Sequence, residues 1–357
     1  MKLSPLVSIY IIVVLFFGAP ATFAFETDQY NLPPEPLFDI GEEVTDHVRE
    51  NIQAAIDKLN ADIAVRLSCL DKTSANGTKC GSETAENKKL DDLRSNDAAA
   101  EAVYRQLGSG NLFITVTGKW FKKHKFSHEP ALYKVSFTDS IFILMPIDYA
   151  TISPTIRMYG TEFGTDKVEH FFQQGYKYYK LYNDAAANGK TAKEAEKKAV
   201  DWGKRTERTY FGMLVSGVYS NADLYANYAG MRFYQGLGSP IQIGSTTRPP
   251  TLILKDGKWQ INEAANINET LLKPFVTDHM NEAFNPSGYS FILYPTVKRV
   301  VKNQCPAWQK AYPQMTRDTA AKRSVDLELW NGEDYGFAKK GHSVAIASCF
   351  DEKLVTQ

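Results

Sequence analysis

The sequence predicts a mainly α-helical fold, a helical bundle with a minor β component. Apolar residues recur at spacings of three and four over several long stretches, which is typical of amphipathic helices. One stretch, residues 250–261, has the pattern of a β-hairpin, because two β-prone runs flank Asp256-Gly257. With 41 basic and 41 acidic residues, the chain has no electrostatic bias toward nucleic acid, and we expect no nucleic-acid partner.

The first 24 residues have the composition of a signal peptide. Lys2 is followed by an apolar core at residues 6–17, and then by small residues at the positions that a signal peptidase requires. We expect cleavage between Thr22 and Phe25, and therefore a secreted or periplasmic protein. An uncleaved membrane anchor is the alternative, because the uncharged stretch is just long enough to cross a bilayer.

The pattern of the mature chain divides it into three regions. Residues 25–160 form an N-terminal helical region, and residues 161–240 a helical bundle. Residues 241–357 form a C-terminal region with the hairpin and further helices. The boundary near residue 240 rests on a following stretch that is rich in glycine, proline, serine and threonine.

The four cysteines predict disulfide bonds, because their number is even and the chain carries an export signal. Three pairings can be drawn. Pairing the neighbours in sequence joins Cys69 to Cys80 and Cys305 to Cys349, and the first bond would close a polar loop.

The N-terminal region begins with a proline-rich, acidic segment, residues 26–40, which we expect to be extended. An amphipathic helix follows over residues 44–70, where apolar residues repeat at three and four. A second, charged helix is expected over residues 83–107 because Gly108 provides a stop signal. Residues 112–117 are rich in β-branched side chains and predict a short strand or a buried segment.

A basic, aromatic stretch begins at Lys119 and ends at Lys125. We expect a solvated surface; peripheral contact with an anionic membrane or a glycan is the alternative. His124 and His128 have a spacing that can bind zinc, but the HExxH glutamate is absent, so the basic surface is favoured.

Three successive helices are expected in the second region, over residues 166–182, 192–216 and 221–236, with breaks at Gly189 and Ser220. Two more helical segments are expected in the C-terminal region, over residues 269–284 and 290–302.

Polar residues gather on the helices of the second region, which otherwise look buried. Asp166 and His170 are four residues apart, as are Asp223 and Asn227, so each pair lies on one face of its helix. Glu207 stands at the entrance to an apolar run. Because buried polar groups are costly unless they are paired, we expect these five side chains to converge. A functional site and a structural network both explain the convergence, and both interpretations stay open.

The motif D-K-x-x-H-F, followed after tens of residues by S-x-x-D-x-x-x-N-x-x-G, resembles the signature of the VanZ-like superfamily. It is similar especially to the YfiM-type lipoproteins of bacterial envelopes. The matching positions are Asp166, Lys167, His170, Phe171, Ser220, Asp223, Asn227 and Gly230. Glu207 falls where those families often carry an acidic residue between the two motifs.

The resemblance extends over residues 160–236 and implies a small helical bundle with a polar pocket at the cell envelope. It supplies no substrate, because the reaction of the family is not settled. The chain departs from the family in two respects. It has no cysteine for lipid attachment near the cleavage site, and no segment after the signal is long enough to span a membrane, whereas VanZ-like proteins are membrane-embedded.

Two classes of function follow. In the first, the protein is a hydrolase or transferase that acts on envelope glycan or lipid-linked material. His170 is then the general base oriented by Asp166, and Glu207 or Asp223 is the acid or a metal ligand. Lys167 or Asn227 stabilises developing charge.

Glu162 is a further binding candidate, because it could contribute to the paired carboxylates of a glycosidase. The cofactor stays open, with a divalent metal as one alternative. In the second class, the chain is a non-enzymatic periplasmic binding or scaffolding protein whose polar cluster is structural. The mixture of His, Lys, Glu, Asp and Asn favours the enzyme, because a structural network rarely needs all five.

Overall fold

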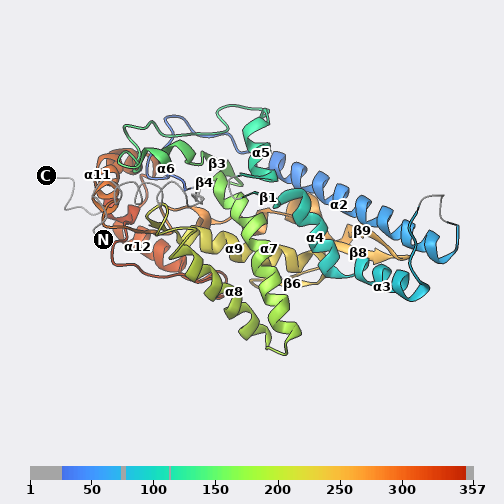
Figure 1. Cartoon of the computed structure of the whole chain (residues 1–357). Coiled ribbons are helices and arrows are strands. Elements are labelled where there is room, and N and C mark those ends of the chain that lie inside the picture. The colour runs from blue at the N-terminus through green and yellow to red at the C-terminus, as the bar shows by residue number, and fades with distance from the viewer. Residues whose placement is uncertain (1–25, 74–77, 112–113, 351–357) are drawn as a thin grey trace, which may run out of the picture.

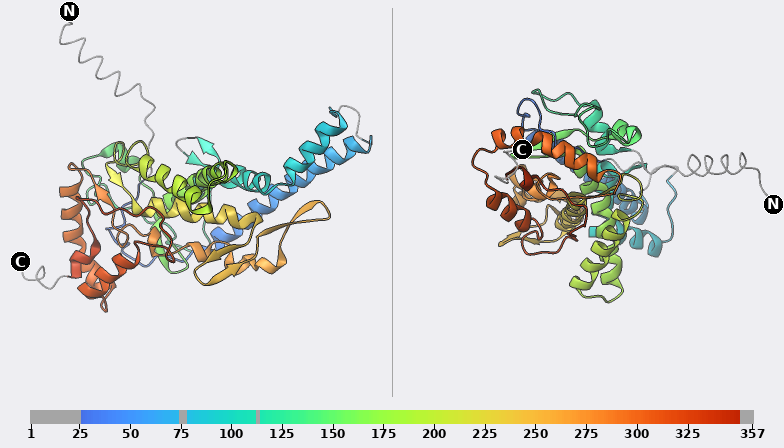
Figure 2. Two further views of the ribbon diagram at one scale, coloured as in Figure 1. Left: turned by 90° about the horizontal axis from the view of Figure 1, so that it is seen from below. Right: turned by 90° about the vertical axis from the view of Figure 1, so that its left-hand side faces the viewer.

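The computed structural model describes residues 26–73, 78–111 and 114–350. Its fold is mainly helical and its strands form only small antiparallel pairs, so the expected fold class is confirmed. Figure 1 shows helices α7 (Thr165–Ala187) and α9 (Asn221–Gly238) near the middle of the molecule. The view from below shows an elongated molecule, with the N-terminal helices at one end and the C-terminal helices at the other (Figure 2).

Helix α2 (Gly41–Leu70) confirms the amphipathic helix expected over residues 44–70. Its buried side chains recur at three and four, as a helix with one face on the core requires; they are Val44, Val48, Ile52, Ile56, Leu59 and Ile63. The disulfide between Cys69 and Cys80 joins the end of this helix to the next segment, as predicted.

The single helix expected over residues 83–107 is wrong, because the chain forms two helices there. These are α3 (Glu83–Leu93) and α4 (Asn96–Leu107). Ser95 starts the second helix, since its side chain accepts a hydrogen bond from the amide of Ala98 at 3.1 Å. The composition of this charged stretch predicts one continuous helix, but the Ser95 cap divides it into two.

The strand expected over residues 112–117 is shorter than predicted. β1 (Gly110–Asn111) pairs with β2 (Ile114–Thr115), and residues 112–113 lie outside the described residues. Thr115 caps helix α5 (Val116–Lys123), so the β-branched run enters a helix. In the basic stretch, Lys119, Lys122, Lys123 and Lys125 are exposed.

A polar face and an aromatic face are combined in the same basic stretch. The Trp120 ring stacks on the rings of His47 and His124, with centroids 4.2 and 4.3 Å away. His124 also contacts Glu43 through Nε2 at 2.6 Å. The lysines therefore face solvent while Trp120 and His124 pack against α2.

An irregular segment follows and leads to the hairpin that precedes the central helices. It contains the short helix α6 (Pro146–Thr151). Strands β3 (Thr155–Met158) and β4 (Thr161–Gly164) then pair antiparallel through a turn in which Tyr159 and Gly160 have positive φ.

The central helices are α7, α8 (Ala192–Glu207) and α9. The expectation of a helix over residues 192–216 is wrong in its second half, because α8 ends at Glu207 and turns lead to β5 (Val218–Tyr219). Helices α7 and α9 cross where two glycines meet. A Cβ on Gly175 would lie 2.5 Å from the Cα of Gly230, so only glycine permits this approach.

The hairpin expected over residues 250–261 is confirmed as β8 (Leu252–Lys255) and β9 (Lys258–Ile261), with Asp256 and Gly257 both at positive φ in the turn. A smaller pair, β6 (Ile241–Ile243) and β7 (Thr246–Arg248), precedes it.

The helix expected over residues 269–284 is wrong, since this part contains only short helical turns. They are the end of α10 (Ile267–Thr270), η2 (Lys273–Phe275) and η3 (Asp278–Met280), and η1 (Glu263–Ala265) precedes them. The helix expected over residues 290–302 is found further along the chain as α11 (Tyr294–Ala311). The remaining elements are β10 (Gly288–Tyr289), which pairs with β5, α12 (Arg317–Asp326) and η4 (Ile346–Phe350).

The N-terminal lead-in packs into the C-terminal region. The Tyr30 hydroxyl donates to the carbonyl oxygen of Val344 at 3.1 Å, and the Trp308 indole donates to the carbonyl oxygen of Tyr30 at 2.8 Å. The predicted disulfide between Cys305 and Cys349 closes this region. Within the described residues, none of the helices combines the length and the apolar character needed to cross a bilayer.

Candidate functional site

The first turn of α7 carries two charged side chains into the interior. Asp166 is 1% exposed and Lys167 is 0% exposed. Val168 and Phe171 on the same helix pack into the main hydrophobic core, which draws this end of the helix inward. A fully buried lysine requires anionic partners, because an isolated charge is strongly disfavoured away from water.

The ammonium group of Lys167 lies among three carboxylates. Its Nζ is 2.6 Å from oxygens of Asp166, Asp223 and Glu282. The ammonium donates hydrogen bonds to Asp166 Oδ2 and Glu282 Oε1, whereas its contact with Asp223 Oδ1 is an ion pair. Burial by itself lowers the pKa of Lys167, but the surrounding carboxylates raise it well above its usual range, so the ammonium stays charged.

The first two turns of α9 supply Asp223 and Asn227. Ser220 caps this helix, since its Oγ accepts a hydrogen bond from the Asp223 amide at 3.0 Å. Oδ2 of Asp223 lies 3.5 Å from Nε2 of His170, and Oδ1 of Asn227 lies 3.0 Å from Nδ1 of the same ring. The imidazole is therefore held from two positions one helical turn apart. The His170 side chain is 14% exposed, whereas Asp223 is 1% exposed.

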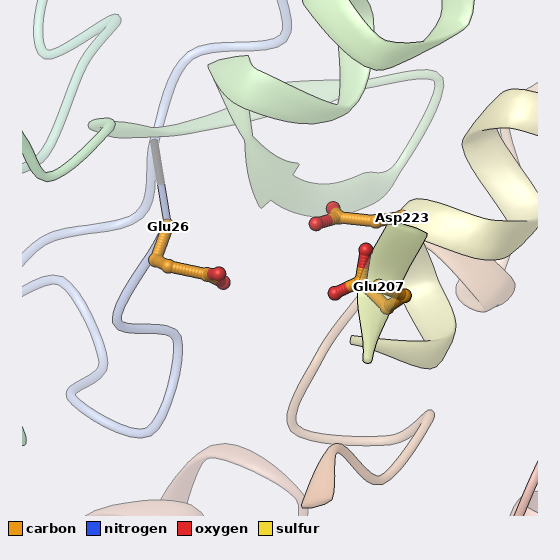
Figure 3. A group of neighbouring side chains, drawn as sticks. All are labelled: Glu26, Glu207 and Asp223. Atoms are coloured by element: carbon orange, nitrogen blue, oxygen red, sulfur yellow. The ribbon is translucent and has the colours of Figure 1, made fainter. Parts of the chain in front are cut away.

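Two glutamates complete the group. Glu207 ends α8, and its Oε1 accepts a hydrogen bond from the Ser220 amide at 2.9 Å. Glu26 lies in the extended lead-in, where its Oε1 accepts from Ser216 Oγ at 2.6 Å. Its Oε2 has no hydrogen-bond partner among the described residues. Figure 3 shows Glu26, Glu207 and Asp223 directed toward one another.

We call these residues the acidic centre: Glu26, Asp166, Lys167, His170, Glu207, Asp223, Asn227 and Glu282. Burial raises the pKa of several of its carboxyl groups. Desolvation, the main cause, raises the pKa of Glu282 to about 7 and the pKa values of Glu26 and Glu207 well above their usual range. Desolvation also raises the pKa of Asp166, although the Lys167 ammonium opposes the rise. Such carboxyl groups can hold protons near neutral pH and donate them.

The acidic centre holds more carboxyl groups than cationic side chains. Its carboxyl groups belong to Glu26, Asp166, Glu207, Asp223 and Glu282, whereas its cations are Lys167 and, when protonated, His170. Uncompensated buried charge is costly, so protons or a bound cation have to balance the surplus.

Among the described residues, two sets of three carboxylates have the spacing of metal ligands, with one oxygen from each residue within 4.8 Å of the others. One set is Asp166, Asp223 and Glu282, and its three members each contact the Lys167 ammonium. The other set is Glu26, Glu207 and Asp223. Asp223 belongs to both sets.

The five side chains expected to converge, Asp166, His170, Glu207, Asp223 and Asn227, all lie in the acidic centre. The expectation that Asp166 orients His170 is wrong. Oδ2 of Asp166 bonds instead to Lys167, and its Oδ1 has no hydrogen-bond partner among the described residues. An ammonium that stays charged is a stronger partner for a buried carboxylate than an imidazole. Asn227 and Asp223 contact the His170 ring and orient it instead of Asp166.

Two expected binding residues are placed differently from His170 and Asn227. Lys167 is enclosed by carboxylates and cannot reach charge on a substrate. Glu162 lies on β4, where alternation turns its side chain away from the face of buried Phe163. It lines a separate cavity of about 670 Å³ together with Arg157 and Arg323, among others.

Glu26 and Glu282 are the members of the acidic centre that the sequence did not indicate. Glu26 belongs to an extended segment and Glu282 to the turns after η3, so neither has a helical period that would reveal its orientation. The one available signal was the shortage of anionic partners for Lys167. A buried lysine beside Asp166 and Asp223 has a third donor that calls for another acceptor.

Comparison of the chain with protein-family models, with curated proteins and with solved structures finds no match.

Proposed function

We propose that the chain is an exported protein of the cell envelope that acts as a hydrolase or transferase on envelope glycan or lipid-linked material. One observation carries the proposal: a surplus of buried carboxyl groups lies next to His170, which is 3.5 Å from Asp223 and whose side chain is 14% exposed. A network with a purely structural role is expected to balance its charges, because surplus buried charge costs stability. Groups whose pKa values are strongly shifted also cluster at functional sites, because catalysis needs such shifts even though they cost stability.

The contacts of His170 suit a general base. With the proton on Nδ1, the ring donates a hydrogen bond to Oδ1 of Asn227, and Nε2 is left to accept a proton. The imidazolium formed in this way lies 3.5 Å from Oδ2 of Asp223, whose charge stabilises it. Glu207, with its raised pKa, is the proposed proton donor.

The proposed location rests on the signal sequence and on the disulfides. Two disulfides fit an oxidising compartment. The signal itself lies outside the described residues. N-terminal sequencing of the exported protein tests the location, because the mature chain should begin between Thr22 and Phe25. The resemblance of the α7 and α9 motifs to VanZ-like and YfiM-type proteins agrees with an envelope location.

A non-enzymatic binding or scaffolding role is the second candidate, and the depth of burial favours it. Asp166, Glu207, Asp223 and Glu282 are each 1% exposed, so a substrate reaches them only if the surrounding chain opens. In this case the acidic centre is a structural network that holds α7, α8 and α9 together.

Substituting His170 by alanine distinguishes the two candidates. Purified protein is incubated with peptidoglycan and with envelope lipids, and product release is measured beside thermal melts. For an enzyme, His170→Ala should lower the rate by about 10²–10⁴-fold with a small change in stability. The control is His128→Ala, because His128 is exposed and lies outside the acidic centre, with its ring tilted against that of Phe38.

The opposite result supports the structural role. His170→Ala and Asp223→Ala would then each cost about 2 kcal/mol or more by leaving buried partners unpaired, and wild type would release no product. A His170→Ala variant that keeps a measurable wild-type rate contradicts the role of His170 as general base.

A further inference from the structure

The carboxylate set Glu26, Glu207 and Asp223 differs from its neighbour in what balances its charge. In the neighbouring set, the Lys167 ammonium contacts all three carboxylates at 2.6 Å. The hydrogen bonds to Glu26 and Glu207 come from neutral donors, the hydroxyl of Ser216 and the amide of Ser220. This set therefore resembles the first one without its cation.

The second oxygen of Glu26 is an independent sign of a missing ligand. Glu26 is 2% exposed, and its Oε2 has no hydrogen-bond partner among the described residues. Its carboxyl group is directed toward Glu207 and Asp223 (Figure 3). A buried carboxylate oxygen without a partner is costly, and a cation between the three groups would remove that cost.

The donor set selects the kind of cation. Sites made of carboxylate oxygens alone are typical of hard cations, whereas zinc and copper sites in proteins usually include imidazole or thiolate groups. Oxygens on opposite sides of a Ca²⁺ ion are about 4.6–5.2 Å apart, and those of Mg²⁺ are about 4.0–4.2 Å apart, as twice the usual bond lengths. The oxygens of Glu26, Glu207 and Asp223 lie within 4.8 Å of one another. An ion of this size class fits between them with small side-chain adjustments.

We propose that Glu26, Glu207 and Asp223 bind one hard divalent cation, Ca²⁺, Mg²⁺ or Mn²⁺, beside the Lys167 ammonium. Asp223 then links the two cations of the acidic centre. Its Oδ1 lies 2.6 Å from Lys167 Nζ, and its Oδ2, which lies 3.5 Å from His170 Nε2 and has no hydrogen-bond partner among the described residues, is the oxygen offered to the metal. The site is proposed independently of the reaction: a Glu207 that binds the cation is ionised and is then not the proton donor, and cation binding is measured without a substrate.

The metal content of the purified protein is the first test. Elemental analysis should find about one equivalent of Ca²⁺, Mg²⁺ or Mn²⁺ per chain, and prolonged dialysis against EDTA should remove it. Adding back CaCl₂, MgCl₂ or MnCl₂ should raise the melting temperature, because a ligand that binds only the folded state stabilises it. Glu207→Gln should lose both the metal and this rise. Glu162→Gln is the matched control, since Glu162 lies outside the acidic centre, and it should retain both.

Glu26→Gln gives the sharper result, because the proposal predicts opposite effects in two conditions. In EDTA the variant should melt above wild type, since it removes one of the crowded buried carboxylates. With the cation present it should melt below wild type, since it lacks a ligand. A protein without metal, whose melting temperature does not respond to any of the three chlorides, overturns the site. A protein that binds the cation but releases no product from glycan or lipid refutes only the proposed reaction.

Discussion

Replacing Lys167 by methionine tests whether its ammonium holds the acidic centre together. Methionine keeps a similar length and removes the charge, so three carboxylates that lie 2.6 Å from Nζ lose their common partner. Removing one partner from a buried ion pair costs about 3–5 kcal/mol. Glu282, whose pKa is raised to about 7, can take up a proton at little cost. We therefore expect Lys167→Met to lower the free energy of unfolding by about 4 kcal/mol, the cost of one broken pair and not of three.

Urea denaturation of wild type and Lys167→Met, followed by circular dichroism, measures this loss. At pH 5 the loss should fall below about 2 kcal/mol, because protonated carboxyl groups do not need an ammonium. The control is Lys197→Met, which breaks an exposed pair with Asp201 and should cost at most about 0.5 kcal/mol. A Lys167→Met variant that unfolds within about 1 kcal/mol of wild type at pH 7 refutes the reasoning.

Two further predictions concern pH and helix packing. Burial raises the pKa of Glu282 from 4.5 to about 7, so the folded state binds this proton more tightly than the unfolded chain. The resulting stability is present below pH 4.5 and is lost as pH rises through 7. Unfolding measured in EDTA should show that wild type loses stability over this interval and that Glu282→Gln removes about 3 kcal/mol of the loss; equal losses for wild type and variant contradict the assignment. Gly230→Ala should cost about 3 kcal/mol in denaturation experiments, because its Cβ would lie 2.0 Å from the Phe171 carbonyl oxygen. Gly341→Ala, which adds its Cβ in open space, should have little effect, and equal costs for the two variants would be evidence against close packing of α7 and α9.

The helices predicted correctly are those whose apolar residues repeat over many turns. In α2 and α9 the repeat runs through almost the whole helix, so local pattern and tertiary burial agree. The predictions over residues 83–107 and 192–216 were too long for different reasons. In the first, Ser95 caps a new helix within a charged stretch. In the second, α8 ends at Glu207, whose side chain points into the acidic centre. The end of this helix therefore depends on residues that are distant in sequence.

The same distinction explains which parts of the site were found. Asp223 and Asn227 lie on one helical face, so spacing alone predicts that they point the same way. Glu26 and Glu282 meet them only through the path of the chain in three dimensions, which no local pattern encodes. The prediction that Asp166 contacts His170 was wrong for a related reason. The Asp166 carboxylate accepts a hydrogen bond from Lys167, its neighbour in sequence, instead.

The long separation within the acidic centre has a consequence for how the protein is made. The Glu282 amide donates a hydrogen bond to the Gln29 side chain across 253 residues of chain. Synthesis and export proceed from the N-terminus, so Glu26 and Lys167 emerge well before Glu282 does. Contacts between such distant segments form slowly, because a long loop has to close first. The acidic centre is therefore completed late, and a chain that stops before Glu282 leaves Lys167 without one of its three carboxylates.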